Sequence, residues 1–191
     1  MAAIVLEGSA RERLLVAASE LFYAEGVNVV GIDRIIERAG VAKASLYSTY
    51  GSKEELVRAY LEDRLRARQL ATERGLAKFD TPRERLLGFF DVLGELFASP
   101  RYRGCAFINA CVESKPDSAA VAVGKLSREW VHSLVLGLAS EVGVADPVSL
   151  AKQLVLLHDG SLMAAMMDRD KLCASTAKAA AEELLDAALA R

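Results

Sequence analysis

Apolar residues recur every three or four positions along most of the chain, which is the pattern of amphipathic α-helices. The first such stretch begins after Ser9 and ends near Gly26. Ser9 and Glu12 have the spacing of a capping box, which fixes the start of this helix. Its apolar stripe consists of Leu14, Leu15, Ala18, Leu21 and Phe22.

The same criteria predict an all-α fold of about nine helices, with no internal repeat and no low-complexity linker. Proline, glycine and capping residues mark most of the boundaries. Thr81, Pro82 and Glu84, for example, combine an N-cap, a proline at the first helical position and a capping-box partner. The expected ranges are 9–26, 32–39, 43–49, 52–74, 81–99, 104–113, 117–142, 146–167 and an Ala-rich helix ending near 190.

The stretch from Val30 to Lys53 predicts two short helices joined by a tight turn. The first carries an apolar stripe and stops at Gly40, because glycine adopts the left-handed conformation that closes a helix. In the second, Leu46 and Tyr50 are four residues apart and therefore point at the same core. We expect Asp33 to cap the first short helix.

The outward face of the second short helix suits the major groove of DNA. Ala44 and Ser45 are small enough for the backbone to approach base edges. Lys53 follows the predicted N-cap Ser52, where backbone amides would also face a phosphate. The candidate DNA-binding residues are Arg34, Lys43, Ala44, Ser45, Tyr47, Ser48, Thr49 and Lys53. The alternative is a helical hairpin that only packs.

The run AGVAKASLYSTYGSKEELV resembles the DNA-binding domain of the tetracycline-repressor (TetR) family of bacterial transcriptional regulators, and the resemblance covers roughly residues 11–56. Its landmarks are Phe22, Gly26, Ala39, Gly40, Val41, Leu46, Tyr47, Tyr50, Ser52, Lys53 and Glu54. Ala42 departs from the pattern, because a helix-capping serine is usual there.

The resemblance implies a helix-turn-helix DNA-binding domain over residues 1–53 and a helical effector-binding and dimerisation domain over residues 54–191. It also implies a homodimer that binds a near-palindromic double-stranded DNA operator and is released by a small-molecule effector. The helix predicted over 146–167 is apolar on more than one face, which independently favours packing against a second chain.

Bulky apolar groups and isolated polar groups in the second domain are candidates for lining an effector cavity. They are Phe90, Leu93, Phe97, Tyr102, Phe107, Asn109, Trp130, His158 and Asp159. For each aromatic residue, ordinary core packing is the alternative. His158 and Asp159 lie in an apolar run and need hydrogen-bond partners if buried, so a satisfied core or dimer contact is their alternative.

Composition and charge are those of a globular chain. The 191 residues are 52% hydrophobic, with a formal net charge of −2, so any DNA contact depends on local charge rather than on total charge. No stretch has the roughly 20 apolar residues of a membrane span, and the N-terminus lacks a signal peptide, so we expect a cytoplasmic protein. Residues 1–8 are expected to form a loose arm.

The chain carries few groups suited to catalysis. It has two histidines, three cysteines and no metal-binding or phosphate-loop motif, so we predict no enzyme activity, no cofactor and no metal. Cys105 and Cys111 lie near Arg101 and Arg103, which would favour a thiolate, but plain buried cysteines are the alternative. The competing function is therefore a helical small-molecule-binding or thiol-sensing protein without operator-specific DNA binding.

Overall fold

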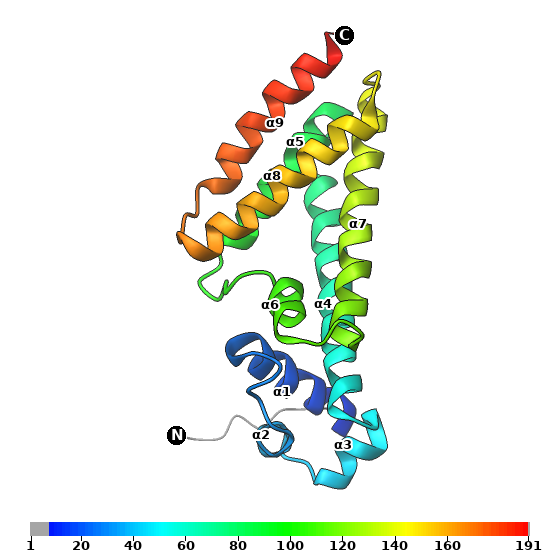
Figure 1. Cartoon of the computed structure of the whole chain (residues 1–191), viewed down its shortest axis with the longest axis vertical. Coiled ribbons are helices and arrows are strands. Elements are labelled where there is room, and N and C mark those ends of the chain that lie inside the picture. Colours follow the sequence, from blue (N-terminus) through cyan, green and yellow to red (C-terminus); the bar gives the residue numbers. More distant parts are fainter. Residues whose placement is uncertain (1–7, 191) are drawn as a thin grey trace. The chain divides into compact units, whose positions relative to one another are not determined.

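The computed structural model describes residues 8–190, so the expected loose arm at residues 1–8 lies almost wholly outside the described residues. Within the described range the chain forms nine helices and no strand (Figure 1). They are α1 (Ala10–Glu25), α2 (Ile32–Ala39), α3 (Lys43–Tyr50), α4 (Lys53–Leu76), α5 (Pro82–Ala98), α6 (Ala106–Glu113), α7 (Ala119–Val142), α8 (Pro147–Met167) and α9 (Cys173–Leu189). The predicted all-α fold is confirmed.

The predicted helix boundaries are largely correct because capping residues fix them locally. The Ser9 hydroxyl accepts a hydrogen bond from the Glu12 amide at 3.3 Å, and the Glu12 carboxylate accepts one from the Ser9 amide at 2.8 Å. Thr81 and Glu84 form the same capping box at the start of α5.

One predicted cap is wrong. The N-cap of α2 is Gly31, and no side chain caps this helix. Asp33 instead accepts a hydrogen bond from Lys43 Nζ at 3.0 Å. The Lys43 ammonium of α3 therefore binds the Asp33 carboxylate, which the sequence predicts to bind backbone amides of α2.

The chain divides into two compact units. Unit 1 combines the chain up to Arg66 with Cys105–Leu126, and unit 2 combines Ala67–Gly104 with the chain from Ser127 onward. The divisions therefore fall inside α4 and α7. The predicted domain boundary after residue 53 stays a prediction.

Unit 1 is built around one apolar cluster that both of its segments supply. The side chains of Leu14, Ile35 and Leu46 from α1, α2 and α3 are fully buried in it. Phe107 and Val123, from the later segment, pack into the same cluster. Helix α6 and the start of α7 are thus part of the core that supports the two short helices.

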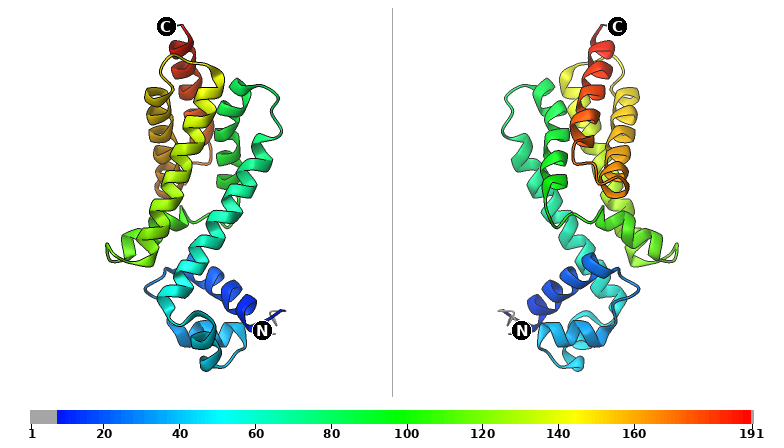
Figure 2. Two further views of the ribbon diagram at one scale, coloured as in Figure 1. Left: turned by 90° about the vertical axis from the view of Figure 1, so that its right-hand side faces the viewer. Right: turned by 90° about the vertical axis from the view of Figure 1, so that its left-hand side faces the viewer.

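Unit 2 is a layered helical unit in which α9 packs against α5 and α8, as the two views of Figure 2 also show. Its core contains the buried side chains of Leu86, Leu87, Phe89, Phe90, Leu93, Phe97, Leu154, Val155, Leu162 and Leu185. At its surface, Arg83 of α5 pairs with Glu182 and Asp186 of α9 at 3.0 and 2.5 Å. Exposed ion pairs of this kind contribute little to stability, so the apolar core holds unit 2 together.

Candidate nucleic-acid interface

The turn between α2 and α3 has the geometry that the sequence predicts. Gly40 has φ 62° and ψ 43°, a left-handed conformation that a residue with a Cβ adopts only at a cost. The amide of Val41 then donates to the carbonyl of Ile36 at 3.1 Å, which satisfies an open carbonyl at the end of α2. The turn therefore sets the direction in which α3 leaves α2.

Helix α3 is held in place from its inner face. Leu46 is fully buried and Tyr50 is 9% exposed. The Tyr50 hydroxyl donates to the carbonyl of Arg11 in α1 at 2.9 Å, and the Arg11 guanidinium lies 5.0 Å from the centre of the Tyr50 ring. Burial raises the pKa of Tyr50, so its hydroxyl stays a donor at neutral pH.

The opposite face of α3 is open to solvent, and it carries the residues predicted to meet DNA. Lys43, Ala44, Tyr47 and Ser48 are exposed, and the Tyr47 side chain is 46% exposed. Ser45 and Thr49 are half-buried at the edges of this face. The face is largely polar and carries the small exposed residues Ala44 and Ser48, which allow close approach to a groove roughly 12 Å wide.

Two of the candidate phosphate-binding cations have carboxylate partners within unit 1. Lys43 pairs with Asp33, and Arg34 forms a two-pronged pair with Glu25 in which Nη2 and Oε1 are 2.9 Å apart. These hydrogen bonds raise the pKa of Lys43 and of Arg34. Both pairs are exposed, so a DNA phosphate would compete with carboxylates that water already screens.

Lys53 is held differently. Its ammonium donates to the carbonyl of Asn28 at 3.4 Å, and the residue is half-buried at the start of α4. Burial lowers the pKa of Lys53, and the nearby Glu113 carboxylate partly offsets that effect. The ammonium therefore lies beside a helix start whose amide groups are favourable for a phosphate.

Sequence reasoning missed the contact that links this region to α6. The Asn28 amide donates to Glu113 Oε2 at 3.1 Å, and the Asn28 side-chain amide donates to the Glu113 carbonyl. Gly26 lies against the same carboxylate, because a Cβ there would come 2.6 Å from Glu113 Oε1. No signal in the sequence pairs these residues, since 85 positions separate Asn28 from Glu113.

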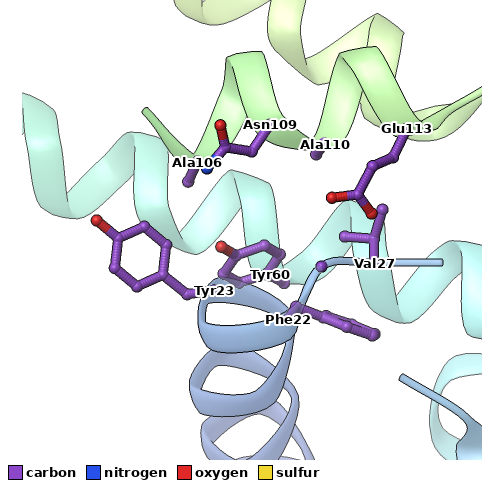
Figure 3. Close-up of a pocket in the computed structure, with 9 residues that line it drawn as sticks. Phe22, Tyr23, Val27, Tyr60, Ala106, Asn109, Ala110 and Glu113 are labelled. Carbon is purple, nitrogen blue, oxygen red and sulfur yellow. The ribbon is translucent and has the colours of Figure 1, made fainter. Parts of the chain in front are cut away.

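Figure 3 shows how α6 lies over the end of α1 at this contact. A small pocket of about 10 Å³ lies among Phe22, Tyr60 and Asn109, which leaves room for about one water molecule. The rings of Phe22 and Tyr60 are 5.6 Å apart. Asn109, predicted to line an effector cavity, therefore lies where α6 meets the end of α1.

The other candidate ligand-binding residues are divided between the two units. Phe107 is buried in the core cluster of unit 1. Phe90, Leu93 and Phe97 are buried in unit 2. This burial agrees with the alternative that these side chains serve ordinary core packing. Their predicted role in binding a ligand stays a prediction.

His158 and Asp159 do have the partners that burial requires. His158 is 2% exposed, and its Nε2 lies 2.8 Å from Arg68 Nη2. Because a guanidinium only donates, Nε2 accepts, and the proton on Nδ1 is donated to Asp159 Oδ1 at 3.0 Å. Phe89 stacks on the His158 ring at 5.4 Å.

This network favours a neutral imidazole. Burial lowers the pKa of His158, and the Arg68 charge acts in the same direction, although Asp159 opposes both. Burial raises the pKa of Asp159, but hydrogen bonds from His158 and Arg128 outweigh that effect and leave its pKa lowered. The Arg68 guanidinium also lies 5.5 Å from the centre of the Trp130 ring.

The cysteines do not pair. Cys105, Cys111 and Cys173 are free thiols. Burial raises the pKa of Cys111 and of Cys173, which reduces the fraction of reactive thiolate at neutral pH. Among residues 8–190, no group of three or more His, Cys, Asp or Glu side chains is placed to hold a metal ion.

Of the helices that the structure describes, none combines the length and apolar character needed to cross a membrane.

Comparison with known proteins gives consistent matches. Residues 14–60 match the family of bacterial regulatory proteins, tetR family. The helix-turn-helix transcriptional regulator YjdC of Escherichia coli is 27% identical over 181 residues, which cover 92% of this chain and 93% of that protein. The transcriptional activator FasR of Mycolicibacterium smegmatis is 48% identical over 52 residues, which cover 27% of this chain and 24% of FasR.

Solved structures extend the similarity to both units. The crystal structure of a TetR-family transcriptional regulator from Streptomyces coelicolor is 31% identical, with a TM-score of 0.88, and the match covers 94% of this chain and 96% of that one. A TetR-type regulator from Streptomyces avermitilis is also 31% identical, with a TM-score of 0.80 over 95% of this chain and 98% of that one. The chain therefore belongs to the TetR family of bacterial transcriptional regulators.

Proposed function

We propose that this protein is a repressor that binds a near-palindromic DNA operator as a homodimer and releases it when a small molecule binds unit 2. The observation that carries the proposal is the outward face of α3, where exposed polar and small side chains are backed by the buried Leu46 and Tyr50. A helix anchored in this way can enter a groove without losing its own packing.

The side chains on and around α3 have separate roles in this proposal. Lys43, Tyr47 and Lys53 bind phosphates and set the register of the protein on the duplex. Ser45, Ser48 and Thr49 hydrogen-bond to base edges or nearby phosphates. The methyl group of Ala44 contacts thymine methyl groups. Arg34 adds a phosphate contact when it leaves Glu25.

Exposed apolar side chains on α8 and α9 support the homodimer. Leu156 and Met167 on α8 are 69% and 70% exposed, and Leu189 on α9 is 47% exposed. A second copy would remove this surface from water by two-fold packing. Two-fold symmetry would then place two α3 helices roughly 34–36 Å apart, which is one turn of DNA.

Effector response is proposed for unit 2 because its polar network is held within an apolar core. A small molecule that shifts α8 would disturb the contacts of His158 and Asp159 with Arg68 and Arg128. Release then requires that the effector bind one arrangement of the dimer more tightly than the other.

The test is binding of the purified protein to the DNA upstream of its own gene, titrated across salt concentrations. A complex of two chains per site that weakens steeply with salt supports the proposal, because phosphate contacts release counterions. Lack of binding both to that DNA and to a random-duplex library would refute operator recognition.

Residue roles are tested with Lys53→Ala and a matched control. Each lost phosphate contact lowers the steepness of log K against log salt by about 0.9, so Lys53→Ala, which removes one contact from each of the two chains, should lower it by about 1.8 on every duplex sequence. Lys125→Ala removes an exposed lysine elsewhere and should leave the slope unchanged. A change in sequence preference with no change in slope would contradict the phosphate role of Lys53.

A further inference from the structure

A surface groove in unit 2 lies between the end of α5, the segment that follows it, and the turn joining α8 to α9. Its volume of about 510 Å³ is in the range of small-molecule sites, roughly 300–1,000 Å³. Phe97, Tyr102 and Met166 give it an apolar wall. The rings of Phe97 and Tyr102 are 5.1 Å apart, with Phe97 buried and Tyr102 half-buried, so the Tyr102 ring is the part of this pair that an apolar ligand can reach.

The rim of the groove is positively charged. Arg103, Arg169 and Lys171 line it together with one carboxylate, Asp170. Asp170 Oδ1 already accepts a hydrogen bond from the Leu172 amide at 2.8 Å. In the part of the chain that the structure describes, Arg169 and Lys171 form no ion pair, and both are exposed. Their charges are available to an anion.

The backbone at this rim is strained in a way that favours a binding role. Arg169 has φ 55° and is the one non-glycine residue with positive φ among residues 8–190. A left-handed conformation is costly for an ordinary side chain, and such strain concentrates at ligand sites. Glycine or asparagine would hold this turn at lower cost, so the arginine side chain needs another explanation.

We propose that this groove binds a small organic acid with an apolar body. The carboxylate faces Arg169 and Lys171, and the apolar body lies against Phe97, Tyr102 and Met166. The role of the acid as an effector rests on the proposed function. Binding of the acid to the groove does not depend on DNA. The preference for an acid follows from Arg169 and Lys171, which form no ion pair among the described residues, and from Asp170, whose Oδ1 already accepts a backbone hydrogen bond.

The test is isothermal titration calorimetry of the full chain with sodium octanoate, compared with 1-octanol. The two probes share the same alkyl chain and differ in charge. Octanoate should bind at least about tenfold more tightly, the factor expected for a charge-assisted hydrogen bond. The double variant Arg169→Asn with Lys171→Gln should lose this preference, while asparagine keeps the left-handed backbone.

Lys125→Gln is the control, since it removes one positive charge from a residue that does not line the groove. It should bind octanoate as the unaltered protein does. Equal affinity for octanoate and octanol, or a double variant that still prefers octanoate, would overturn the inference. If octanoate binds as expected but no operator is found, the groove stands and the regulatory role fails. If DNA binds and octanoate does not, the regulatory role stands and the proposed acid site in the groove fails.

Discussion

Burial of His158 should make the stability of unit 2 depend on pH. The folded chain holds the imidazole neutral, whereas the unfolded chain exposes it with a pKa near the ordinary value of 6.5. Because burial lowers the pKa of His158 in the folded state, the unfolded state binds more protons as the pH falls. Titration of His158 therefore leaves the free energy of unfolding unchanged well above pH 6.5 and lowers it as the pH falls below that value.

The magnitude follows from the linkage between proton binding and folding. One proton taken up only by the unfolded chain changes the free energy of unfolding by at most about 1.4 kcal/mol per pH unit. Integrated from roughly pH 7.5 to 5.5, the loss approaches about 1.4 kcal/mol if the folded protein stays unprotonated. Carboxylates ordinarily titrate at about pH 3.9–4.3, below this window.

Urea unfolding followed by Trp130 fluorescence measures this effect, because Trp130 is the single tryptophan and lies beside Arg68. His158→Gln removes the titrating group but keeps a carbonyl that can accept from Arg68. Its free energy of unfolding should lose the pH dependence between pH 7.5 and 5.5 that the unaltered protein shows, about 1.4 kcal/mol at most.

His132→Gln is the matched control and should keep the full pH dependence, because the buried network does not include His132. Parallel pH curves for the unaltered protein and His158→Gln would refute the reasoning. So would a rise in stability on acidification, since it would mean that Asp159 outweighs burial and raises the pKa of the imidazole.

Four further substitutions test the packing and one side-chain hydrogen bond. Leu46→Ala should destabilise unit 1 by about 2–5 kcal/mol, measured by circular dichroism, and should abolish DNA binding; full affinity would contradict the anchoring of α3. Gly88→Ala should lower the free energy of unfolding by about 1–3 kcal/mol, because the new Cβ would lie 2.3 Å from Phe79 Cε2. In contrast, Gly137→Ala should raise it by about 0.5–1 kcal/mol, because its Cβ meets no described atom within 4 Å. Asn28→Ala removes a side-chain hydrogen bond to α6 and should lower the thermal midpoint by an amount equivalent to about 1–2 kcal/mol; an unchanged midpoint would mean that this contact adds nothing to the stability of unit 1.

The local features of the interface could be predicted from the sequence. The turn at Gly40, the burial of Leu46 and Tyr50 and the open face of α3 all follow from residues within about four positions of one another. Helix starts at Ser9 and Thr81 were equally predictable, because a capping box is complete within one helical turn.

Features that join distant segments were not predictable in the same way. The expected cap by Asp33 failed because α2 begins at Ile32 with Gly31 as its N-cap, so Asp33 lies inside the first turn and pairs with Lys43 on the next helix. The fold places Phe107 in the core cluster of unit 1 and Asn109 at the small pocket beside α1, and their predicted role as cavity residues stays a prediction. Apolar character predicts burial, but it does not say which core a side chain joins.

The sequence by itself determined the helices, the capping boxes at Ser9 and Thr81 and the surface that α3 presents, because those depend on backbone hydrogen bonds and spacing along one element. Only the tertiary structure decided that Glu113 holds Asn28, that Arg68 fixes the tautomer of His158, and that the rim of a groove gathers three cations. Each of these depends on distances between side chains far apart in the chain, and those distances are set by packing.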